Sequence, residues 1–345
     1  HDPVAVAGAL EPATPVQIEL RSALDRIDTE PIGGELLRTR RGATRGWLKV
    51  QDGCDRKCSF CATRLARGES RSRAPDQVVA EALLLSGRHP ELVVTGIHIG
   101  HYGKDLDPTW TLSRLVALLL DRVPDARFRL GSIEATEVDD LLIDLLATSG
   151  GRLAPHVHMP LQSGADPVLK LMRRWHTREQ YRVRVLELAE RVSPLGLGAD
   201  VITGFPGESE HDHDSTRALI DELPFTYLHV FPFSPRDGTV AVRLPHPVPQ
   251  RVSGQRSREL REIAQAKGRE YRETRVGGSA EVVVEGDGGT ALTGDYLRVG
   301  VGGALRTAHH HEQTGTLERL PTGTLQGDAD HLYITLSQQP SVISA

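Results

Sequence analysis

All three cysteines of this 345-residue chain lie in one short segment, as Cys54, Cys58 and Cys61, with the spacing C-x3-C-x2-C. Three thiolates this close together can each bind one corner of a cubic [4Fe–4S] cluster, because soft sulfur ligands suit iron–sulfur chemistry and one short loop can wrap the cube. A zinc knuckle is the alternative, but it requires a fourth Cys or His. No such residue follows Cys61 within about twenty positions, so the spacing favours the cluster.

A cubic cluster held by three cysteines has one iron without a protein ligand. The amino and carboxylate groups of S-adenosylmethionine (SAM) can chelate that iron. One electron from the cluster can then cleave the sulfonium to give a 5′-deoxyadenosyl radical. The cysteine spacing therefore indicates radical chemistry on SAM, with Cys54, Cys58 and Cys61 as the metal ligands.

The length and composition of the chain limit the class of protein. At 345 residues the chain is long enough for one large and one small domain. Cysteines gathered at one site, with none elsewhere to pair, argue against a secreted disulfide scaffold and for the reducing cytoplasm. No apolar run reaches the roughly twenty residues that span a bilayer, so we expect no membrane segment. A net charge of −5 does not by itself indicate a nucleic-acid binder.

From residue 46 onward, short β-rich runs alternate with amphipathic helical stretches. The predicted strands cover 47–51, 92–96, 126–131, 156–161, 198–204 and 227–233, and the predicted helices cover 75–86, 112–123, 138–147, 167–172, 178–191, 209–223 and 250–274. Six β/α units in order predict an α/β fold with a parallel sheet, either an open doubly wound sheet or a partial (β/α)6 barrel. In both folds chemistry gathers at the carboxyl ends of the strands, and the cysteine loop follows the first strand.

Polar, glycine-bearing segments follow the other five predicted strands. They cover 95–103, 131–134, 161–164, 204–208 and 233–239. Any one of them could be an ordinary turn. Five of them at the same edge of a parallel sheet favour a shared ligand site, because functional loops cluster at that edge.

Histidines and arginines elsewhere in the chain invite further interpretations. His156 and His158 alternate along a predicted strand and so share a face. Without an adjacent carboxylate, hydrogen-bonded or substrate-facing roles are favoured over a metal site. The run 309–311 favours a solvated turn. Residues 1–45 read as a lead-in, with a helix predicted over 16–27 and a basic run over 38–45 that is either solvated or contacts phosphate.

Several segments resemble the radical-SAM methylthiotransferases that modify tRNA and ribosomal proteins. The resembling segments are 48–61, 67–73, 158–164, 172–174, 200–208 and 233–239. Segments 95–103 and 132–134 are most similar to the subgroup that methylthiolates N6-threonylcarbamoyladenosine at position 37 of tRNA. Short β-rich runs over 280–285, 297–301 and 332–336 resemble, more weakly, the TRAM β-barrel that follows the core in this family. The implied organisation is a lead-in at 1–45, a radical-SAM core at 46–275 that folds as a partial (β/α)6 barrel, and an all-β TRAM-like barrel at 276–340.

The resemblance also implies roles for individual residues. Phe60 and the segment 202–208 would lie near the adenine of SAM, Thr95 and Gly96 would lie along its methionine part, and Glu134 would bind its ribose. Three further residues would lie close to the cofactor or the substrate, namely Gln162, Ser163 and Arg173. The full set of implied cofactor-binding residues is Phe60, Thr95, Gly96, Glu134, Gln162, Ser163, Arg173, Asp200, Ile202, Gly204 and Phe205.

The implied partners are the anticodon loop of a tRNA and a reductant such as flavodoxin or ferredoxin, with the protein itself a monomer. The arginines that follow the cysteine loop are predicted to meet RNA phosphates. They are Arg64, Arg67, Arg71 and Arg73. Residues 276–345 hold eight acidic and three basic side chains, so RNA contact is expected on the preceding helix instead. Its basic residues are Arg251, Arg256, Arg258, Arg261, Lys267, Arg269, Arg272 and Arg275.

One departure from the family leaves alternatives open. The family carries an N-terminal domain with three further cysteines, which bind a second [4Fe–4S] cluster implicated in handling the inserted sulfur. Those ligands are absent from this sequence. The chain is then either a fragment of a longer protein or a single-cluster enzyme whose radical reaction inserts no sulfur. Further alternatives are a methylthiotransferase acting on isopentenyladenosine in tRNA or on a ribosomal protein, and a non-catalytic RNA-binding protein with a structural metal.

Overall fold

The computed structural model describes residues 44–285, 288–302 and 320–336. Within these ranges, two three-stranded parallel sheets form the core. The first sheet holds, in order, β1 (Gly46–Lys49), β4 (Glu91–Thr95) and β5 (Arg127–Leu130). The second holds β6 (His156–His158), β7 (Gly196–Thr203) and β8 (Tyr227–Pro232).

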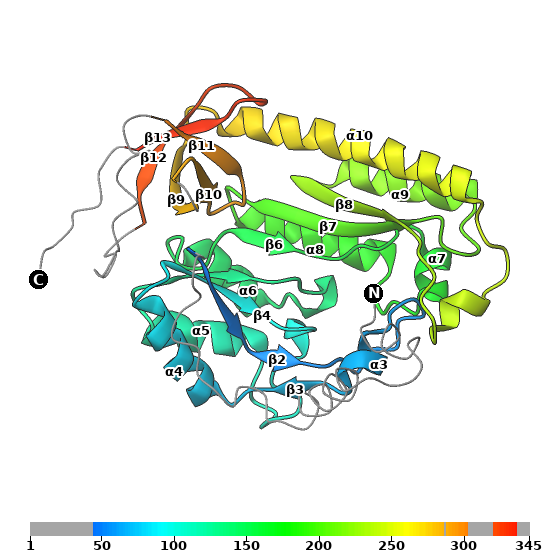
Figure 1. The fold of residues 1–345 in the computed structure, drawn as a ribbon, viewed down its shortest axis with the longest axis horizontal. Helices are drawn as coiled ribbons and strands as arrows, with labels where there is room; N and C mark the ends of the chain where they lie inside the picture. The colour runs from blue at the N-terminus through cyan, green and yellow to red at the C-terminus, as the bar shows by residue number, and fades with distance from the viewer. Residues whose placement is uncertain (1–43, 286–287, 303–319, 337–345) are drawn as a thin grey trace, which may run out of the picture.

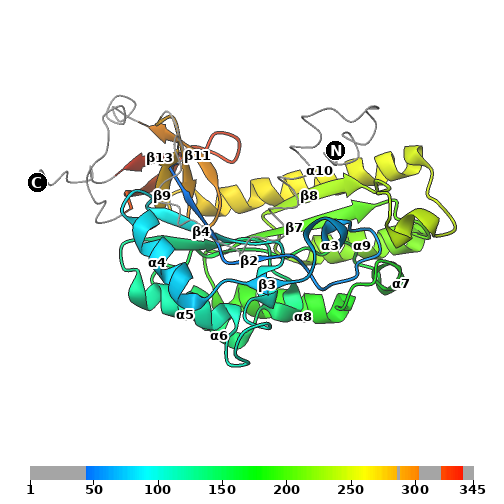
Figure 2. The ribbon, with the colours of Figure 1, turned by 60° about the horizontal axis from the view of Figure 1, so that its bottom comes forward.

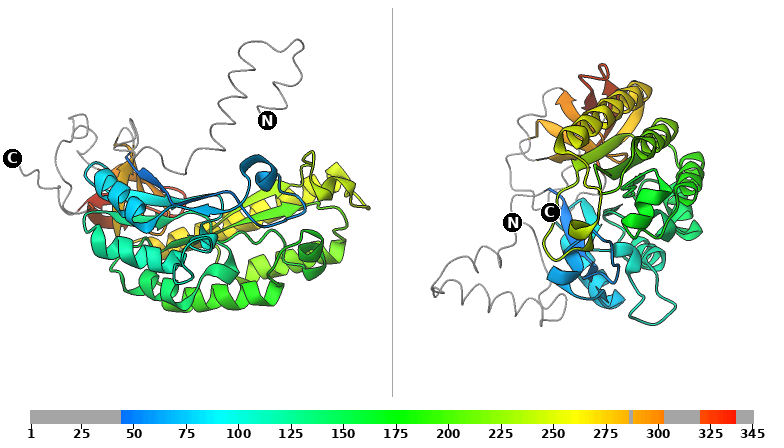
Figure 3. Two further views of the ribbon diagram at one scale, coloured as in Figure 1. Left: turned by 90° about the horizontal axis from the view of Figure 1, so that it is seen from below. Right: turned by 90° about the vertical axis from the view of Figure 1, so that its right-hand side faces the viewer.

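Isolated parallel bridges join the two sheets. Phe128 pairs with Leu153, and Ser132 pairs with His158, so β5 lies beside β6. The six strands therefore follow one another in chain order without the reversal that a doubly wound sheet requires. Of the two folds that the β/α pattern allows, the core is therefore the partial barrel. Figure 3 shows that this barrel is open on one side.

Helices cover the convex face of the two sheets, and each predicted helix and strand between 47 and 275 is present with ends within about three residues of the prediction. Figure 2 shows α4, α5, α6 and α8 side by side on this face. The helices are α3 (Thr63–Arg67), α4 (Pro75–Ser86), α5 (Leu112–Arg122), α6 (Asp140–Thr148), α7 (Asp166–Leu171), α8 (Arg178–Arg191), α9 (Glu210–Glu222) and α10 (Gln250–Arg275). The predicted helix over 16–27 and the histidine run over 309–311 lie outside the described residues.

Local sequence signals explain where the helices begin. Thr111 caps α5 by accepting a hydrogen bond from the backbone of Arg114. Thr177 and Gln180 form a reciprocal capping box at the start of α8. The buried faces of these helices pack on strand residues such as Leu92 and Phe128, which are fully excluded from solvent. No helix of the described residues is both long and apolar enough to cross a bilayer.

A closed five-stranded barrel follows α10, which runs along one edge of the core (Figure 1). Its strands are β9 (Ser279–Glu285), β10 (Thr290–Thr293), β11 (Arg298–Gly302), β12 (Thr322–Gln326) and β13 (Tyr333–Leu336), in the order β10-β11-β13-β12-β9. Val282, Leu325 and Ile334 fill its interior. The prediction of a small β-barrel is confirmed. The sequence reading missed β10 and β12, because both are short and rich in Thr and Gly, with little apolar alternation.

A buried charge network fastens the barrel to the core. Glu91 accepts hydrogen bonds from Nε of Arg127 at 2.7 Å and from Nε of Arg129 at 2.8 Å. Arg129 also donates to the backbone carbonyls of Thr293 and Gly294, both at 2.9 Å. Arg129 thus holds the turn between β10 and β11, and Arg127 donates to the Glu281 carbonyl of β9 at 3.3 Å.

Candidate functional site

The cysteine loop spans residues 53–61, between β2 (Gln51–Asp52) and α3, at the carboxyl end of the first barrel strand. β2 pairs antiparallel with β3 (Arg71–Ser72), which closes the base of the loop. Gly53 turns the chain with a φ of +69°, and a Cβ there would lie 1.8 Å from the backbone oxygen of Glu69. Gln51 Nε2 then donates to the Gly53 carbonyl at 2.7 Å. The three cysteines are free thiols.

Each thiol has a different partner from elsewhere in the fold or the loop. Cys54 Sγ lies 3.5 Å from Nδ1 of His98, and Cys58 Sγ accepts a hydrogen bond from Arg174 at 3.7 Å. Cys61 Sγ and the Thr63 hydroxyl are 3.0 Å apart. Burial raises the pKa of the Cys58 thiol, although the Arg174 guanidinium opposes that shift. N–H and O–H groups beside sulfur favour its negatively charged, metal-binding form.

The surroundings of the thiols argue against a structural zinc ion. A tetrahedral zinc site brings its donor atoms to within about 4 Å of one another. In the part of the chain that the structure describes, sets of three His, Cys, Asp or Glu donor atoms within 4.8 Å of one another contain no cysteine. Three spaced thiols suit a larger cluster better than a single ion.

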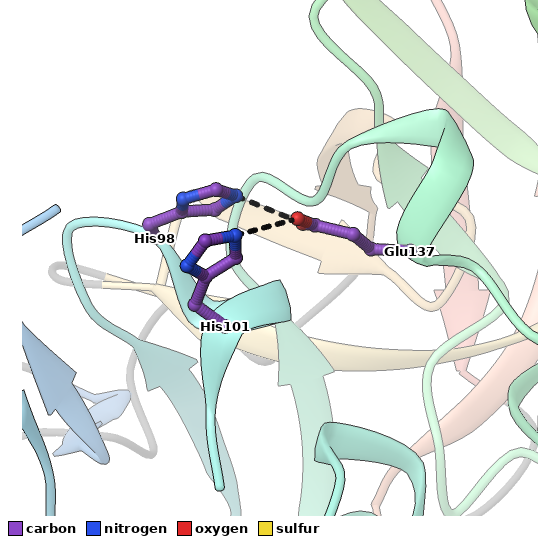
Figure 4. Close-up of side chains that lie close together, drawn as sticks. All are labelled: His98, His101 and Glu137. Atoms are coloured by element: carbon purple, nitrogen blue, oxygen red, sulfur yellow. Dashed lines mark hydrogen bonds and ion pairs between the residues drawn. The ribbon is translucent and has the colours of Figure 1, made fainter. Parts of the chain in front are cut away.

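His98, His101 and Glu137 form a compact group beside the cysteine loop (Figure 4). His98 Nε2 lies 2.9 Å and His101 Nε2 lies 3.4 Å from the two carboxylate oxygens of Glu137. The two imidazole rings stack with centroids 4.0 Å apart. Arg56, from the cysteine loop itself, donates to the same carboxylate at 3.2 Å. The group therefore ties the loop to the segments that follow β4 and β5.

The two imidazoles of this group differ in pKa. Burial opposes protonation of His98, but its contacts with Cys54 and Glu137 outweigh burial and raise its pKa to about 9. Burial and the neighbouring His98 charge lower the pKa of His101 to about 4. Burial would raise the pKa of Glu137, yet His98 and Arg56 hold it below its usual value. One charged and one neutral ring thus share one carboxylate.

Arg174 is one of the site residues that the sequence did not single out. His98, Glu137 and Arg56 are others. Its guanidinium is buried between Cys58, the Glu134 carboxylate and the Trp175 ring, whose centroid lies 4.5 Å from Cζ. The predicted site residue, Arg173, has a positive φ of +57° and lines a cavity of about 520 Å³ beside Lys170. Because the two arginines are adjacent, the sequence does not indicate which of them points toward the cysteine loop. Glu134 does lie at the site, paired with Arg174.

Aromatic side chains gather on the predicted adenine side. Phe60 meets the edge of Phe205 with ring centroids 6.4 Å apart, and Phe205 meets Phe233 at 5.1 Å. Ile202 packs against the same cluster. Gly204 has a φ of +72° and donates its N–H to Glu208 at 2.6 Å. The structure thus brings Phe60, from the cysteine loop, beside the turn after β7.

The structure places four predicted site residues in two environments, with Thr95 and Gly96 in one and Gln162 and Ser163 in the other. The Thr95 carbonyl accepts from the backbone of Val50, and a Cβ at Gly96 would lie 2.8 Å from the Gln51 carbonyl, so this strand end lies against the base of the cysteine loop. Gln162 has a φ of +64°, and its buried side-chain oxygen has no hydrogen-bond partner among the described residues. Ser163 is fully buried, with its hydroxyl 3.3 Å from that of Thr216 on α9.

Histidines and Asp200 line the concave face of the second sheet. The Tyr227 hydroxyl lies 2.8 Å from His156 Nε2 and 3.0 Å from His158 Nδ1, so both histidines are hydrogen-bonded, as predicted. The expectation that no carboxylate lies beside them was wrong, because Asp200 approaches His158 from the neighbouring strand. Asp200 lies 3.2 Å from His158 and 3.4 Å from His229. The donor atoms of His158, Asp200 and His229 are close enough to hold a metal ion, as are those of His98, His101 and Glu137.

Two predicted RNA-contacting arginines are structural instead. Arg73 is buried, pairs with Glu81 at 2.5 Å and donates to the Lys49 carbonyl. Arg256 on α10 is buried against Glu208 at 2.7 Å. The prediction that these two side chains face RNA was therefore wrong, because both neutralise buried carboxylates. Arg64 and Arg67 remain exposed near the loop. Of the basic run over 38–45, the structure describes Arg45, which pairs with Glu285 at 2.9 Å.

A family model described as "Radical SAM superfamily" matches residues 48–220, which include the cysteine loop, the second half of β1 and the next four core strands. The chain belongs to the radical SAM superfamily. The three thiols, each with an N–H or O–H group beside its sulfur, fit the [4Fe–4S] cluster that this superfamily implies together with SAM. Cys54, Cys58 and Cys61 would hold the cluster.

Curated relatives of this radical SAM protein are tRNA methylthiotransferases. It is 40% identical over 66% of its length to the threonylcarbamoyladenosine tRNA methylthiotransferase MtaB of Bacillus subtilis, covering 51% of that protein. It is 33% identical over 81% of its length to MtaB of Aquifex aeolicus, covering 70%. It is also 36% identical over 73% of its length to the tRNA-2-methylthio-N(6)-dimethylallyladenosine synthase of Bacillus subtilis, covering 50%. The chain thus spans about half the length of both Bacillus subtilis relatives.

Proposed function

We propose that this radical SAM protein is a tRNA methylthiotransferase that adds a methylthio group to C2 of N6-threonylcarbamoyladenosine at position 37. The observation that carries the proposal is the cysteine loop, with three free thiols at the carboxyl end of the first barrel strand and a different polar partner beside each sulfur. The identity of 40% to an MtaB protein supports the choice of nucleoside.

The residues around the loop suit the binding of SAM. When bound, the cluster would supply the electron that cleaves SAM, and a second SAM would supply the methyl group. Phe60 and Phe205 offer an apolar, aromatic side for the adenine, with the backbone of Ile202 and Gly204 beside it. Glu134 offers a carboxylate for the ribose hydroxyls. The placement of Thr95 and Gly96 along the methionine part stays a prediction, since the Thr95 carbonyl already accepts a hydrogen bond from Val50.

The other residues proposed to lie near the cofactor belong to the second sheet or to the segments beside it. In the part of the chain that the structure describes, no group donates to the buried side-chain oxygen of Gln162, so it can accept a hydrogen bond, and Asp200 presents its carboxylate to the concave face. The roles of Ser163 and Arg173 near the cofactor stay predictions, since Ser163 hydrogen bonds with α9 and Arg173 lines a neighbouring cavity. The domain limits at 45 and 275 are part of the same proposal.

The proposed RNA partner is the anticodon loop. The target adenine must leave its stack to reach the interior of the barrel, and unstacked loop nucleotides allow this at the lowest cost. Arg64 and Arg67 lie exposed beside the cysteine loop, where they can meet phosphates. A flavodoxin or ferredoxin in the reducing cytoplasm would deliver the electrons to the monomer.

A methylthiotransferase acting on isopentenyladenosine is the second candidate, because the dimethylallyladenosine synthase is 36% identical over a similar span. Mass spectrometry of tRNA nucleosides from a deletion strain separates the two substrates by which methylthio nucleoside disappears. If both nucleosides persist and a ribosomal peptide loses its methylthio group instead, the tRNA proposal is wrong.

Anaerobic reconstitution tests the chemistry directly. We expect about four iron and four sulfide per chain, and release of 5′-deoxyadenosine from SAM with dithionite. One zinc per chain would instead support a non-catalytic RNA-binding protein. A chain that cleaves SAM without methylthiolating tRNA would favour a radical reaction without sulfur insertion.

A further inference from the structure

His98 contacts one cysteine sulfur, and several further contacts fix the position of its ring. Its Nδ1 lies 3.5 Å from Cys54 Sγ, and its Nε2 lies 2.9 Å from the Glu137 carboxylate. Its backbone N–H donates to the Gln51 side chain at 2.8 Å. The side chain is buried, and His101 stacks on one face of its ring at 4.0 Å. A ring fixed at both nitrogens and on one face cannot turn away from the sulfur.

Glu137 is held as firmly as His98. Arg56 donates to its carboxylate at 3.2 Å, and the Arg56 guanidinium lies over the Trp175 ring at 3.8 Å from the centroid. Arg56 belongs to the cysteine loop, between Cys54 and Cys58. The carboxylate therefore connects the loop that carries the sulfur with the histidine that faces it.

The partners of the ring assign its protons. A carboxylate accepts hydrogen bonds and donates none, so the contact with Glu137 places a proton on Nε2. A cysteine that binds iron does so as a thiolate, which also only accepts. With the metal-bound sulfur on one side and the carboxylate on the other, both contacts are favourable only when His98 donates from both nitrogens.

We infer that His98 is a positioning residue for the cluster, which donates a hydrogen bond from Nδ1 to the sulfur of Cys54 while Glu137 holds its other nitrogen. This inference rests on the cluster of the proposed function and is independent of the RNA substrate. Hydrogen bonds to cluster sulfurs set reduction potential, because they stabilise the more negative, reduced state. His98 thus makes the cluster easier to reduce before SAM cleavage.

Redox titration of the reconstituted protein, followed by electron paramagnetic resonance, measures this effect. We expect His98→Leu to lower the reduced-to-oxidised ratio at a fixed ambient potential about tenfold, which corresponds to about 59 mV for one electron. His98→Asn keeps a side-chain N–H near the position of Nδ1 and should restore most of the ratio. Glu137→Gln removes the carboxylate that orients the ring and should shift the ratio in the same direction as His98→Leu.

His213 provides a matched control. Its Nε2 lies 2.9 Å from Glu259, which reproduces the geometry of the His98–Glu137 pair on α9 and α10, elements that do not contribute to the cysteine loop. His213→Leu should leave the ratio unchanged. An equal ratio in wild type and His98→Leu, or an equal shift in His213→Leu, would overturn the role of His98.

Iron and sulfide content separates this inference from the proposed function. A wild-type chain that takes up no cluster would overturn the cluster assignment itself. If His98→Leu alone fails to hold the cluster, the comparison of His98→Asn with Glu137→Gln decides, since the inference requires a higher potential in the first than in the second. Equal potentials in these two variants would refute it.

Discussion

Glu91→Gln tests how the C-terminal barrel is held on the core. The Glu91 carboxylate is fully buried and accepts hydrogen bonds from both Arg127 and Arg129, at 2.7–2.9 Å. The substitution preserves shape but leaves two buried guanidinium groups without a counter-charge. Breaking a buried ion pair on one side typically costs about 3–5 kcal/mol, and we expect a loss of that size in the free energy of unfolding at neutral pH.

Urea unfolding followed by circular dichroism measures this loss. The matched control is Glu187→Gln, which removes a partly exposed carboxylate 3.0 Å from Arg184 on the helical surface. Such surface pairs contribute about 0.5 kcal/mol, so the control should hardly change the midpoint. A loss below about 1 kcal/mol in Glu91→Gln would show that the network contributes little to stability.

The pH dependence of the same variant has a definite sign. Burial alone would raise the pKa of Glu91, but Arg127 and Arg129 outweigh it and hold that pKa below its usual 4.5. The stabilisation is therefore fully present above the pKa of the unfolded chain and is lost as the pH falls through the lower pKa of the folded protein. The stability gap between wild type and Glu91→Gln should be constant from pH 8 to 6 and shrink below about pH 4. A gap that widens in acid would contradict the reasoning.

Other substitutions test the loop, the adenine side and the RNA-facing surface. Cys58→Ala should abolish release of 5′-deoxyadenosine, and release at the wild-type rate would disprove the cluster assignment. Gly204→Ala places a Cβ at a φ of +72° and 2.4 Å from the Ser253 side chain, so urea unfolding should show a loss of about 2 kcal/mol or more. Arg67→Ala should weaken tRNA binding in a filter assay and reduce the salt slope by about one, whereas Arg73→Ala should lower stability and leave that slope unchanged.

The fold was predictable from the sequence because its signals are local. Strands such as β4, with Leu92, Val93 and Val94, are apolar on both faces and mark a covered parallel sheet. Helix starts at Thr111 and Thr177 carry recognisable caps. The β/α pattern alone allowed both an open sheet and a partial barrel, since the choice depends on whether β5 pairs with β6, a contact between elements about thirty residues apart in the chain. The family resemblance implied the partial barrel, and that prediction is confirmed.

The direction of charged side chains was the part of the site that the sequence could not show. Arg173 and Arg174 are adjacent in the sequence, yet only Arg174 donates to Cys58, and Arg173 has a positive φ of +57°. The sequence around Arg73 and Arg256 is typical of surface cations, but in the fold both pair with buried carboxylates. Burial decides whether an arginine neutralises a carboxylate or meets a phosphate, and burial is a property of the assembled fold.

The cysteine loop shows most clearly which features follow from the local sequence and which depend on the assembled fold. Its spacing alone identifies three sulfur ligands, yet three of the contacts that shape it come from three other β/α units: His98 follows β4, Glu137 follows β5, and Arg174 follows α7. Ser59 adds a hydrogen bond to the Leu171 carbonyl at 2.7 Å. A peptide with the same spacing would have the ligands without these donors. The loop can therefore take this arrangement only when the barrel strands are already in order, and the donors that would tune a bound cluster are a consequence of the fold rather than of the motif.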